Sequence, residues 1–464
     1  MNIEHVTAFL YALKPKGIRF GLENTRLVLE KLSNPQEKLA VVHLAGSNGK
    51  GSTAAFLDSV LRRAGRRVGL YTSPHLSHYR ERFRVNGQPV TDRQICAAAE
   101  RLFAEGLDLN PQEVVDWVER EGMRDKMGSE TWYQLRGGAS DFTSLTFFEC
   151  TTILSVLLFA QADLDVALME CGMGGRLDAT NVLAPLVSVI LPIHLEHTEW
   201  LGDTLEAIAG EKAGIIKPGV PVICARQEPE AFRVIKARAK ELGAPLFTLG
   251  REFEAEGGWR EARFEIDDRS LGPVRLGLPG AHQVENAAVA LGCLPHLEPH
   301  GIQASDAEVT AGLSRVSWPA RFERFNVPGE WIIDAAHNPA GARVLAGTIR
   351  DVFGGEKVRL VFGVLGDKRV EEMLELLAPL ASGIDLVRSK DARARDPQTL
   401  VRLISGPARV HSSVEAALEQ LWSEPGGPVV ICGSLTVAGE ARDFLEEKGA
   451  SPGSQGEEPA RKAG

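Results

Sequence analysis

The chain has 464 residues, of which 44% are hydrophobic and 25% charged, so it is long and apolar enough to form two or three globular domains. Lys and Arg number 52 against 62 Asp and Glu, which gives a formal net charge of −10. This balance argues against a protein that mainly binds a nucleic-acid backbone or an anionic membrane surface, because both select basic patches, but it is compatible with a local cationic cleft for small anions.

Short apolar runs alternate with longer amphipathic segments through the first half of the chain. Such runs are typical of buried strands, and a helical period is typical of the segments between them. Their alternation predicts an α/β fold with a mostly parallel sheet and helices on both faces. The loop at 46–52, described below, makes the predicted domain P-loop-type. The predicted strands cover residues 39–44, 67–71, 165–170, 186–193 and 220–224, and the helices cover 53–64, 148–160 and 204–213.

The alternation restarts late in the chain and predicts a second, smaller, Rossmann-like α/β unit. Its predicted strands cover residues 331–334, 358–364, 384–388 and 429–432, and its helices cover 339–350, 370–380 and 414–422.

Breaks in these patterns predict the domain limits. Pro and Gly interrupt the pattern within residues 297–305, so we expect a first domain over 1–297 and a C-terminal domain over 303–449. The polar segment 109–144 is expected to be largely a surface excursion. The Gly-, Pro- and Glu-rich tail 450–464 is expected to be disordered.

The six cysteines are widely spaced and form no CxxC pair, which is typical of reduced, buried thiols in a cytoplasmic protein. Residues 1–17 lack the apolar core of a signal peptide, and no run of about 18 apolar residues is present. We therefore expect a cytoplasmic protein that does not span a membrane.

The strongest local signal is Gly46-Ser47-Asn48-Gly49-Lys50-Gly51-Ser52, which follows a predicted strand and opens a helix. Glycines allow a tight turn around phosphates, and a helix N-terminus offers N–H groups and a positive dipole. Lys50 can reach the β- and γ-phosphates. The strict GxxxxGK[ST] pattern is not met, because Leu44 stands in place of its first glycine and Gly51 follows the lysine. A glycine-rich turn with an incidental lysine is the alternative.

Other candidate residues are ambiguous when they are taken singly. Glu170 ends a predicted strand, where a carboxylate can hold magnesium or simply be solvated. His194 and His197 do not have the spacing of a zinc-protease motif, so they can also be capping or packing residues. Lys212 alone is most simply an exposed helix lysine, and Ser73 alone marks a turn.

Taken jointly and in order, the motifs resemble the Mur ligase superfamily, specifically its folylpolyglutamate synthase/dihydrofolate synthase family. The resemblance extends over nearly the whole chain. It rests on the loop at 46–52 and on Tyr71-Thr72-Ser73-Pro74-His75-Leu76, Leu145-Thr146-Phe147-Phe148-Glu149, the segment 170–181, His197-Thr198-Glu199-Trp200-Leu201-Gly202, Glu211-Lys212-Ala213-Gly214-Ile215, Trp318-Pro319-Ala320-Arg321-Phe322-Glu323 and Asp334-Ala335-Ala336-His337-Asn338-Pro339.

The resemblance implies a set of metal-binding residues. Ser73, Glu170 and His197 would bind magnesium, and Lys212, as N6-carboxylysine, would hold a second magnesium ion. Glu196 departs from the family, which usually has aspartate there. The catalytic residues implied in this way are Lys50, Glu170, His197 and Lys212.

The resemblance also implies the ligand-binding residues. ATP would bind to Gly46, Ser47, Asn48, Gly49, Lys50, Gly51 and Ser52, with Asn286 at the adenine, Arg321 at the phosphates, and Asp334 and His337 facing ATP and the incoming amino acid. Because Lys50 and Arg321 fall in different predicted domains, ATP would lie between these domains. A pteroate pocket would be lined by Thr146, Phe148 and Asp178, and Ser434 is a weaker candidate on the substrate side.

The implied activity is ATP-dependent addition of L-glutamate to a folate or pteroate carboxylate through an acyl phosphate. Its partners would be ATP, two Mg²⁺ ions, L-glutamate and dihydropteroate or a reduced folate, and the protein would be monomeric. One alternative is another Mur-type amide ligase, which usually has a separate N-terminal domain for which a phosphate loop starting at Gly46 leaves no room. The other is an ATP-binding switch without ligase chemistry, against which the joint presence of Lys50, Glu170, His197 and Lys212 argues.

Overall fold

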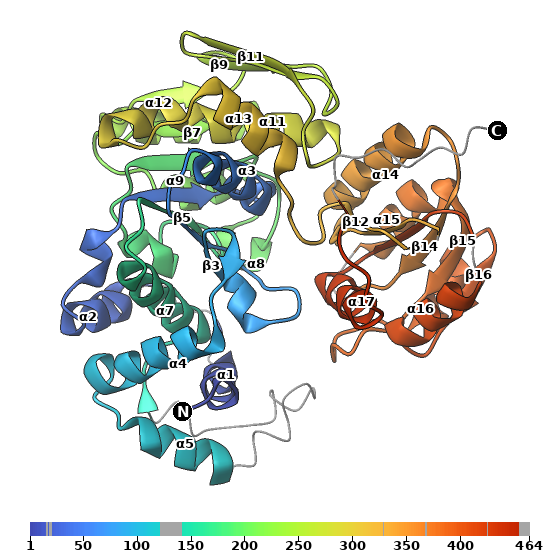
Figure 1. Cartoon of the computed structure of the whole chain (residues 1–464), viewed down its shortest axis with the longest axis horizontal. Coiled ribbons are helices and arrows are strands. Elements are labelled where there is room, and N and C mark those ends of the chain that lie inside the picture. Colours follow the sequence, from blue (N-terminus) through green and yellow to red (C-terminus); the bar gives the residue numbers. More distant parts are fainter. Residues whose placement is uncertain are drawn as a thin grey trace. The chain divides into compact units, whose positions relative to one another are not determined.

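The computed structural model describes residues 1–14, 17, 21–120, 142–327, 329–366, 369–424 and 426–453. These residues form two compact units, each with its own sheet (Figure 1). The first unit comprises Met1–Ala255, Phe264–Leu271 and Glu285–Gly312, and the second comprises Glu256–Arg263, Gly272–Val284 and Leu313–Gly464.

The chain enters the second unit for the last time after Gly312, whereas the boundary expected from the sequence, 297–305, lies within the first unit. The interruption in the pattern there is a short 3-10 helix, Glu298–His300, that ends on Gly301 in the left-handed conformation. It separates two helices, α12 (Leu294–Leu297) and α13 (Asp306–Arg315). Pro and Gly therefore mark a turn between helices here rather than a link between units.

The first unit contains an eight-stranded sheet in the order β4-β3-β2-β5-β1-β6-β7-β8. The neighbours from β2 to β8 are parallel, and β3 and β4 add an antiparallel edge. All five predicted strands are confirmed, with shifts of a few residues at their ends. The strands are β1 (Val41–Ala45), β2 (Val68–Tyr71), β3 (Phe83–Val85), β4 (Gln88–Pro89), β5 (Val166–Glu170), β6 (Val187–Ile190), β7 (Val222–Cys224) and β8 (Leu246–Thr248).

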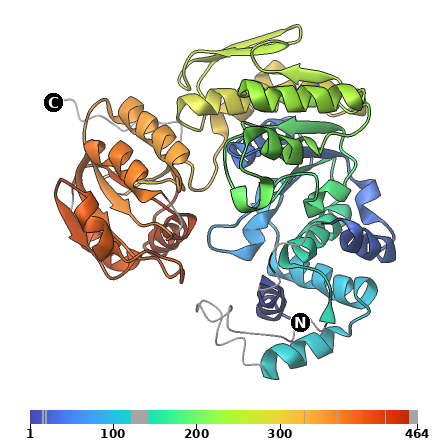
Figure 2. The ribbon, with the colours of Figure 1, turned by 180° about the vertical axis from the view of Figure 1, so that it is seen from behind.

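A group of helices beside this sheet builds a large buried core (Figures 1 and 2). Four helices pack on one another there: α1 (Ile3–Ala12), α4 (Asp92–Arg101), α5 (Pro111–Arg120) and α7 (Phe147–Gln161). On α5, Val114, Trp117 and Val118 are buried. The expectation of a surface excursion is therefore wrong for this part of 109–144, because an apolar stripe fixes the helix in the core; residues 121–141 lie outside the described residues.

Strand β1 connects two buried clusters. Val41 packs with α7, and Ala45 packs with α9 (Leu205–Ala213) and α10 (Pro229–Glu241). Because side chains alternate along a strand, His43 points to the same face, between these clusters. This unit also contains α2 (Glu23–Lys31), α3 (Lys50–Arg63), α8 (Thr198–Leu201) and the part of α11 (Ala281–Gly292) from Glu285 onward. Helix α3 packs against β1, β2 and β5.

A three-stranded sheet in the order β11-β10-β9 was not expected from the sequence. Its strands are β9 (Phe253–Glu256), β10 (Ala262–Ile266) and β11 (Arg269–Val274). Strand β10 alternates between buried and exposed residues, which is typical of a sheet with one solvated face.

The second unit contains a six-stranded sheet in the order β12-β13-β17-β14-β15-β16, parallel except for β12. Helix α14 packs on α15 and α16 packs on α17, so helices cover both faces (Figure 1). The predicted α/β unit is thus confirmed. Its elements are β12 (Glu323–Phe325), β13 (Trp331–Ile333), α14 (Pro339–Phe353), β14 (Val358–Phe362), α15 (Val370–Leu377), β15 (Ala381–Leu386), β16 (Ala408–Val410), α16 (Val414–Ser423), β17 (Val429–Cys432) and α17 (Leu435–Glu447).

The start of the C-terminal tail is ordered. Gly453 N donates to Arg324 O at 2.9 Å, and Pro452 bridges to Phe325 of β12. The expectation of disorder is therefore wrong for residues 451–453, because their backbone pairs with a strand edge; residues 454–464 lie outside the described residues. All six cysteines are buried and free, and none of the described helices is long and apolar enough to cross a bilayer.

Candidate active site

The predicted phosphate loop joins β1 to α3. Gly49, the residue before α3, has φ +89°, a conformation that favours glycine. The Ser47 hydroxyl donates to His194 O at 3.2 Å and accepts from His194 N at 3.0 Å, which ties the loop to the segment after β6. Lys50 starts α3, and its Nζ donates to Gly46 O at 2.8 Å. The loop is thus held open at a helix N-terminus, an arrangement that binds phosphate.

Asn286 of α11 lies against this loop. The side chain is buried, and a Cβ placed on Gly49 would come 2.5 Å from Asn286 Oδ1. The sequence links Asn286 with ATP only through the family resemblance, and the structure places it in contact with the turn that precedes α3.

A carboxylate lies at the end of β5, next to the loop. Glu170 is 5% exposed, and its Oε1 lies 3.9 Å from Lys50 Nζ. Its Oε2 accepts from Ser73 N at 3.3 Å. Three predicted residues, Lys50, Ser73 and Glu170, are therefore brought together by β2, β5 and α3, at the carboxyl edge of the parallel strands where ligands of such sheets bind.

Lys212 is buried in α9, contrary to the interpretation of an exposed lysine, and is 1% exposed. Its Nζ lies 2.7 Å from Glu196 Oε1. Burial lowers the pKa of Lys212, the charge of Lys50 lowers it further, and Glu196 opposes the shift. Burial raises the pKa of Glu196, but the charges of Lys212 and Lys50 outweigh it and hold the pKa of Glu196 below its ordinary value. Glu196, noted in the sequence only as a departure from the family, is therefore part of the site.

A cavity of about 380 Å³ opens beside Ser73. It brings together five residues expected at the site from the sequence, namely Ser73, Thr146, Phe148, Asp178 and His197. His197 precedes α8 with φ +47°, and Thr146 caps α7 by accepting from Glu149 N. Glu149, Met173, Leu177, Leu201 and Glu211 also line the cavity; they lie within the family motifs but were given no role from the sequence. Arg82, another lining residue, lies outside every motif.

Asp178 is held by the protein on both carboxylate oxygens. Oδ2 accepts from Gly172 N and Met173 N, each at 2.9 Å, and Oδ1 faces Thr180 N at 3.0 Å and Thr180 Oγ1 at 2.5 Å. Burial raises the pKa of Asp178, while these donors oppose the shift. The carboxylate therefore organises the loop that forms one wall of the cavity.

The remaining predicted residues lie in the second unit. Asp334 follows β13 and is half-buried; its carboxylate accepts from Phe322 N and Ala336 N at 2.9 Å, and desolvation raises its pKa. His337 Nδ1 lies 2.8 Å from Ala335 O. Ser434 caps α17 after β17, the parallel neighbour of β13. Asp334 and Ser434 thus lie at the same edge of the sheet, and Arg321 lies nearby on the segment before β12.

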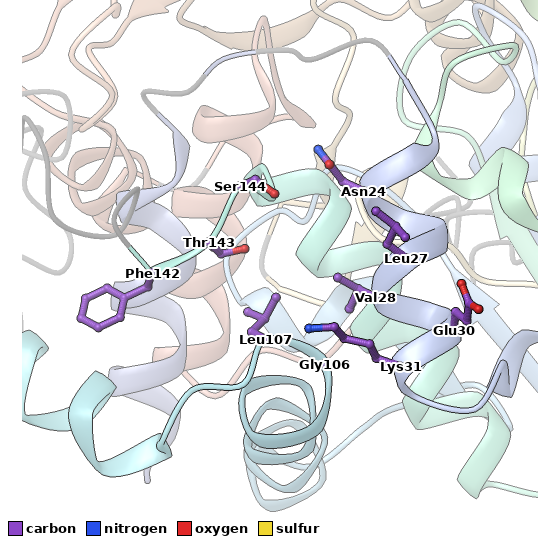
Figure 3. A pocket seen from close by; sticks show the side chains of 10 residues that line it. All are labelled: Asn24, Leu27, Val28, Glu30, Lys31, Gly106, Leu107, Phe142, Thr143 and Ser144. Atoms are coloured by element: carbon purple, nitrogen blue, oxygen red, sulfur yellow. The ribbon is translucent and has the colours of Figure 1, made fainter.

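A second hollow, of about 490 Å³, lies elsewhere in the first unit, between α2 and the segment 142–144 (Figure 3). Leu27, Val28 and Lys31 of α2 point into it, opposite Leu107 and Phe142. None of the residues expected at the site from the sequence lines it.

Comparison with known proteins gives consistent matches over the whole fold. The Mur ligase middle domain matches residues 125–294, and the Mur ligase, glutamate ligase domain matches residues 320–435. The dihydrofolate synthase/folylpolyglutamate synthase of Bacillus subtilis is 33% identical over 377 residues, which cover 79% of this chain and 81% of that protein. The chain belongs to the folylpolyglutamate synthase/dihydrofolate synthase family.

Solved structures of this family show the same architecture. Escherichia coli FolC in complex with DHPP and ADP superposes with a TM-score of 0.80 at 30% identity, covering 97% of this chain and 98% of that one. The Yersinia pestis enzyme complexed with AMPPNP and Mn ion gives 0.79 at 30% identity, covering 96% and 98%. The chain is therefore an ATP-dependent Mur-type ligase, and both alternatives from the sequence, another Mur-type amide ligase and a switch without ligase chemistry, lack this support.

Proposed function

We propose that this ligase joins L-glutamate to the carboxylate of dihydropteroate or a reduced folate, with ATP as the phosphoryl donor. The observation that carries the proposal is the position of Ser73, which lines the cavity and also donates its N–H to Glu170 beside Lys50. An acceptor in the cavity would therefore have its reacting carboxylate next to the phosphates of a nucleotide on the loop.

The residues proposed to hold the nucleotide are those that the family resemblance implies. Residues 46–52 offer backbone N–H groups and the Lys50 ammonium to the phosphates, and the buried Asn286 would contact adenine. Arg321 would contact the phosphates with its forked donors, and Asp334 and His337 would face ATP and glutamate. Ser434 is proposed on the glutamate side.

The residues beside the loop fit a divalent cation bound jointly with ATP. Among the described residues no three His, Cys, Asp or Glu side chains form a closed metal site. Mg²⁺ usually binds through one or two carboxylates, with substrate phosphates and water completing its shell. Glu170 and Ser73, with His197 at the cavity, would supply the protein share of this shell. When bound, the ion would neutralise charge that develops on the transferred phosphoryl group.

Lys212 is proposed to be carboxylated and to help hold a second Mg²⁺. A neutral amine is needed for attack on CO₂, which forms the N–C bond of a carbamate and releases a proton. The lowered pKa of Lys212 favours the neutral amine. The carbamate would then face Glu196, and two anions so close are stable only with a cation between them. Mass spectrometry of gently handled protein with bicarbonate should show one added carboxyl group on Lys212; an unmodified lysine would refute this part.

The chemistry needs activation because a carboxylate is a poor electrophile. An acceptor carboxylate oxygen attacks the γ-phosphorus, the bond to ADP breaks, and an acyl phosphate forms. The amine of L-glutamate then attacks the acyl carbon, loses a proton, and phosphate leaves. In this scheme Lys50 holds the transferred phosphoryl group, while Thr146, Phe148 and Asp178 form the acceptor pocket.

A coupled assay tests the proposal. ADP release should require both L-glutamate and an acceptor, and a comparison of dihydropteroate with tetrahydrofolate identifies the acceptor. Lys50→Met should abolish turnover, whereas Lys38→Met, at an exposed position, should not. ADP release that needs neither glutamate nor acceptor would overturn the assignment.

A further inference from the structure

A buried chain of hydrogen bonds runs from the middle of the large sheet to the wall of the cavity. His43, on β1, is fully buried, and its Nε2 lies 2.8 Å from Thr180 Oγ1. Thr180 Oγ1 lies 2.5 Å from Asp178 Oδ1, and Asp178 lines the cavity. No sequence motif indicated His43.

The positions of the protons determine which group donates and which accepts in each of these hydrogen bonds. Three backbone N–H groups point at the Asp178 carboxylate, which favours its ionised form, and an ionised carboxylate only accepts hydrogen bonds. The single hydroxyl proton of Thr180 therefore goes to Asp178. Thr180 Oγ1 is then left as an acceptor, and His43 donates to it when the His43 proton is on Nε2. Cys171 Sγ lies 3.1 Å from the same Nε2 and shares this contact as a weaker partner.

The surroundings of His43 agree with this tautomer. Burial, helped by the charge of Lys217, lowers the pKa of His43 to about 3, so the ring is neutral and carries one proton. Its Nδ1 is buried without a hydrogen-bond partner among the described residues. An acceptor left unpaired in this way is more readily tolerated than a buried N–H group.

Asp178, the last member of this hydrogen-bond chain, shapes the cavity wall. Asp178 Oδ2 binds the N–H groups of Gly172 and Met173, which both line the cavity. Gly172 is packed directly against the Phe148 ring, so that a Cβ there would collide with it. A shift of the Asp178 carboxylate would therefore move the backbone against which Phe148 rests.

We propose that His43 is a positioning residue for the acceptor pocket, and that it acts through Thr180 to hold the Asp178 carboxylate and the Gly172–Met173 backbone in place. The proposal rests on the proposed function in one respect, namely that the acceptor occupies this cavity. The phosphate loop is held separately, through Ser47 and His194. Loss of the hydrogen-bond chain from His43 to Asp178 should therefore leave nucleotide binding unchanged.

The test separates acceptor binding from nucleotide binding. His43→Leu removes the donor at similar volume, and Thr180→Val removes the hydroxyl. Each should raise the KM for the acceptor about 5- to 10-fold, as for the loss of one buried hydrogen bond, with the KM for ATP unchanged within about twofold. His43→Gln keeps an Nε2 donor and Thr180→Ser keeps the hydroxyl, so both should stay close to wild type. The acceptor KM of the double variant His43→Leu/Thr180→Val should be no higher than that of the more impaired single variant, because both changes break the same hydrogen-bond chain.

Ser188→Ala provides a matched control. Ser188 is the buried register partner of His43 on β6, and its hydroxyl donates to Ile215 O at 3.2 Å. Its loss should lower stability without changing the acceptor KM.

The proposal is overturned if His43→Leu keeps the wild-type acceptor KM, if His43→Gln is as impaired as His43→Leu, or if the two KM values rise together. Should His43→Leu not fold, the Thr180→Val and Thr180→Ser pair decides alone. Wild-type turnover with each acceptor is measured in the same assay, so a failure of the ligase assignment is seen independently of these variants.

Discussion

The neutral, buried state of His43 predicts a pH dependence of stability. Its pKa is about 3 in the folded protein against an ordinary 6.5, so between these values the unfolded chain binds a proton that the folded chain does not. The contribution of the neutral His43 to the unfolding free energy is therefore fully present above pH 6.5, and it is lost as the pH falls toward 3. At pH 5, which is about 1.5 units below the pKa of His43 in the unfolded chain, protonation has stabilised the unfolded state by about 2 kcal/mol.

Removal of the imidazole should remove this slope. We expect the unfolding free energy of wild type to fall between pH 7 and pH 5 by about 2 kcal/mol more than that of His43→Gln. The difference between the two proteins matters, because burial raises the pKa of carboxyls such as Asp178 and Asp58, which has the opposite effect below their raised pKa. His300→Gln, at an exposed position, should leave the wild-type slope unchanged.

The assay must report on the first unit alone, because the two units can unfold separately. Urea unfolding at each pH, followed by pulsed hydrogen exchange of a peptide that covers β1, meets this need. Parallel pH curves for wild type and His43→Gln would refute the reasoning, since they would mean that His43 takes up its proton equally in the folded and unfolded states.

Three further outcomes follow from the site. Gly49→Ala should raise the KM for ATP about tenfold or more, because φ is +89° and the new Cβ would lie 2.5 Å from Asn286 Oδ1; nucleotide titration checks this, and unchanged affinity would contradict it. Gly172→Ala should instead raise the acceptor KM and spare that for ATP, since its Cβ would displace the Phe148 ring. Chelation of divalent ions should abolish turnover, and added Mg²⁺ should restore it; activity that persists in chelator would argue against the proposed metal site.

The sequence predicted most of what depends on local periodicity and little of what depends on side-chain contact. The strand that ends at Glu170 and the helix at 204–213 are visible as apolar runs and helical periods. That Lys212 is buried is not visible, because the charge partner that makes its burial tolerable, Glu196, lies 16 residues earlier, before α8. The same limit applies to His43, whose partner Thr180 is 137 residues distant.

The elements that were missed have a different cause. Helix α5 lies in a segment that is polar on average, and only the spacing of Val114, Trp117 and Val118 shows its buried stripe. Strands β9 to β11 are short and half-exposed, so their alternation is hard to separate from loop sequence. Such elements are defined by the sheet that they join rather than by their own composition.

The charges beside the phosphate loop bear on how a chain with a net charge of −10 can bind ATP. Lys50 lies 3.9 Å from Glu170, and Lys212 lies 2.7 Å from Glu196, so the formal charges of these four side chains cancel. Arg176, another cation near the cavity, is likewise paired with Glu211 at 2.7 Å. Side chains alone therefore leave little net positive charge for a triphosphate in this part of the first unit. On the proposed function, the balance must come from the N–H groups at the start of α3, from Arg321 and from divalent ions, which is the physical reason to expect a strict metal requirement.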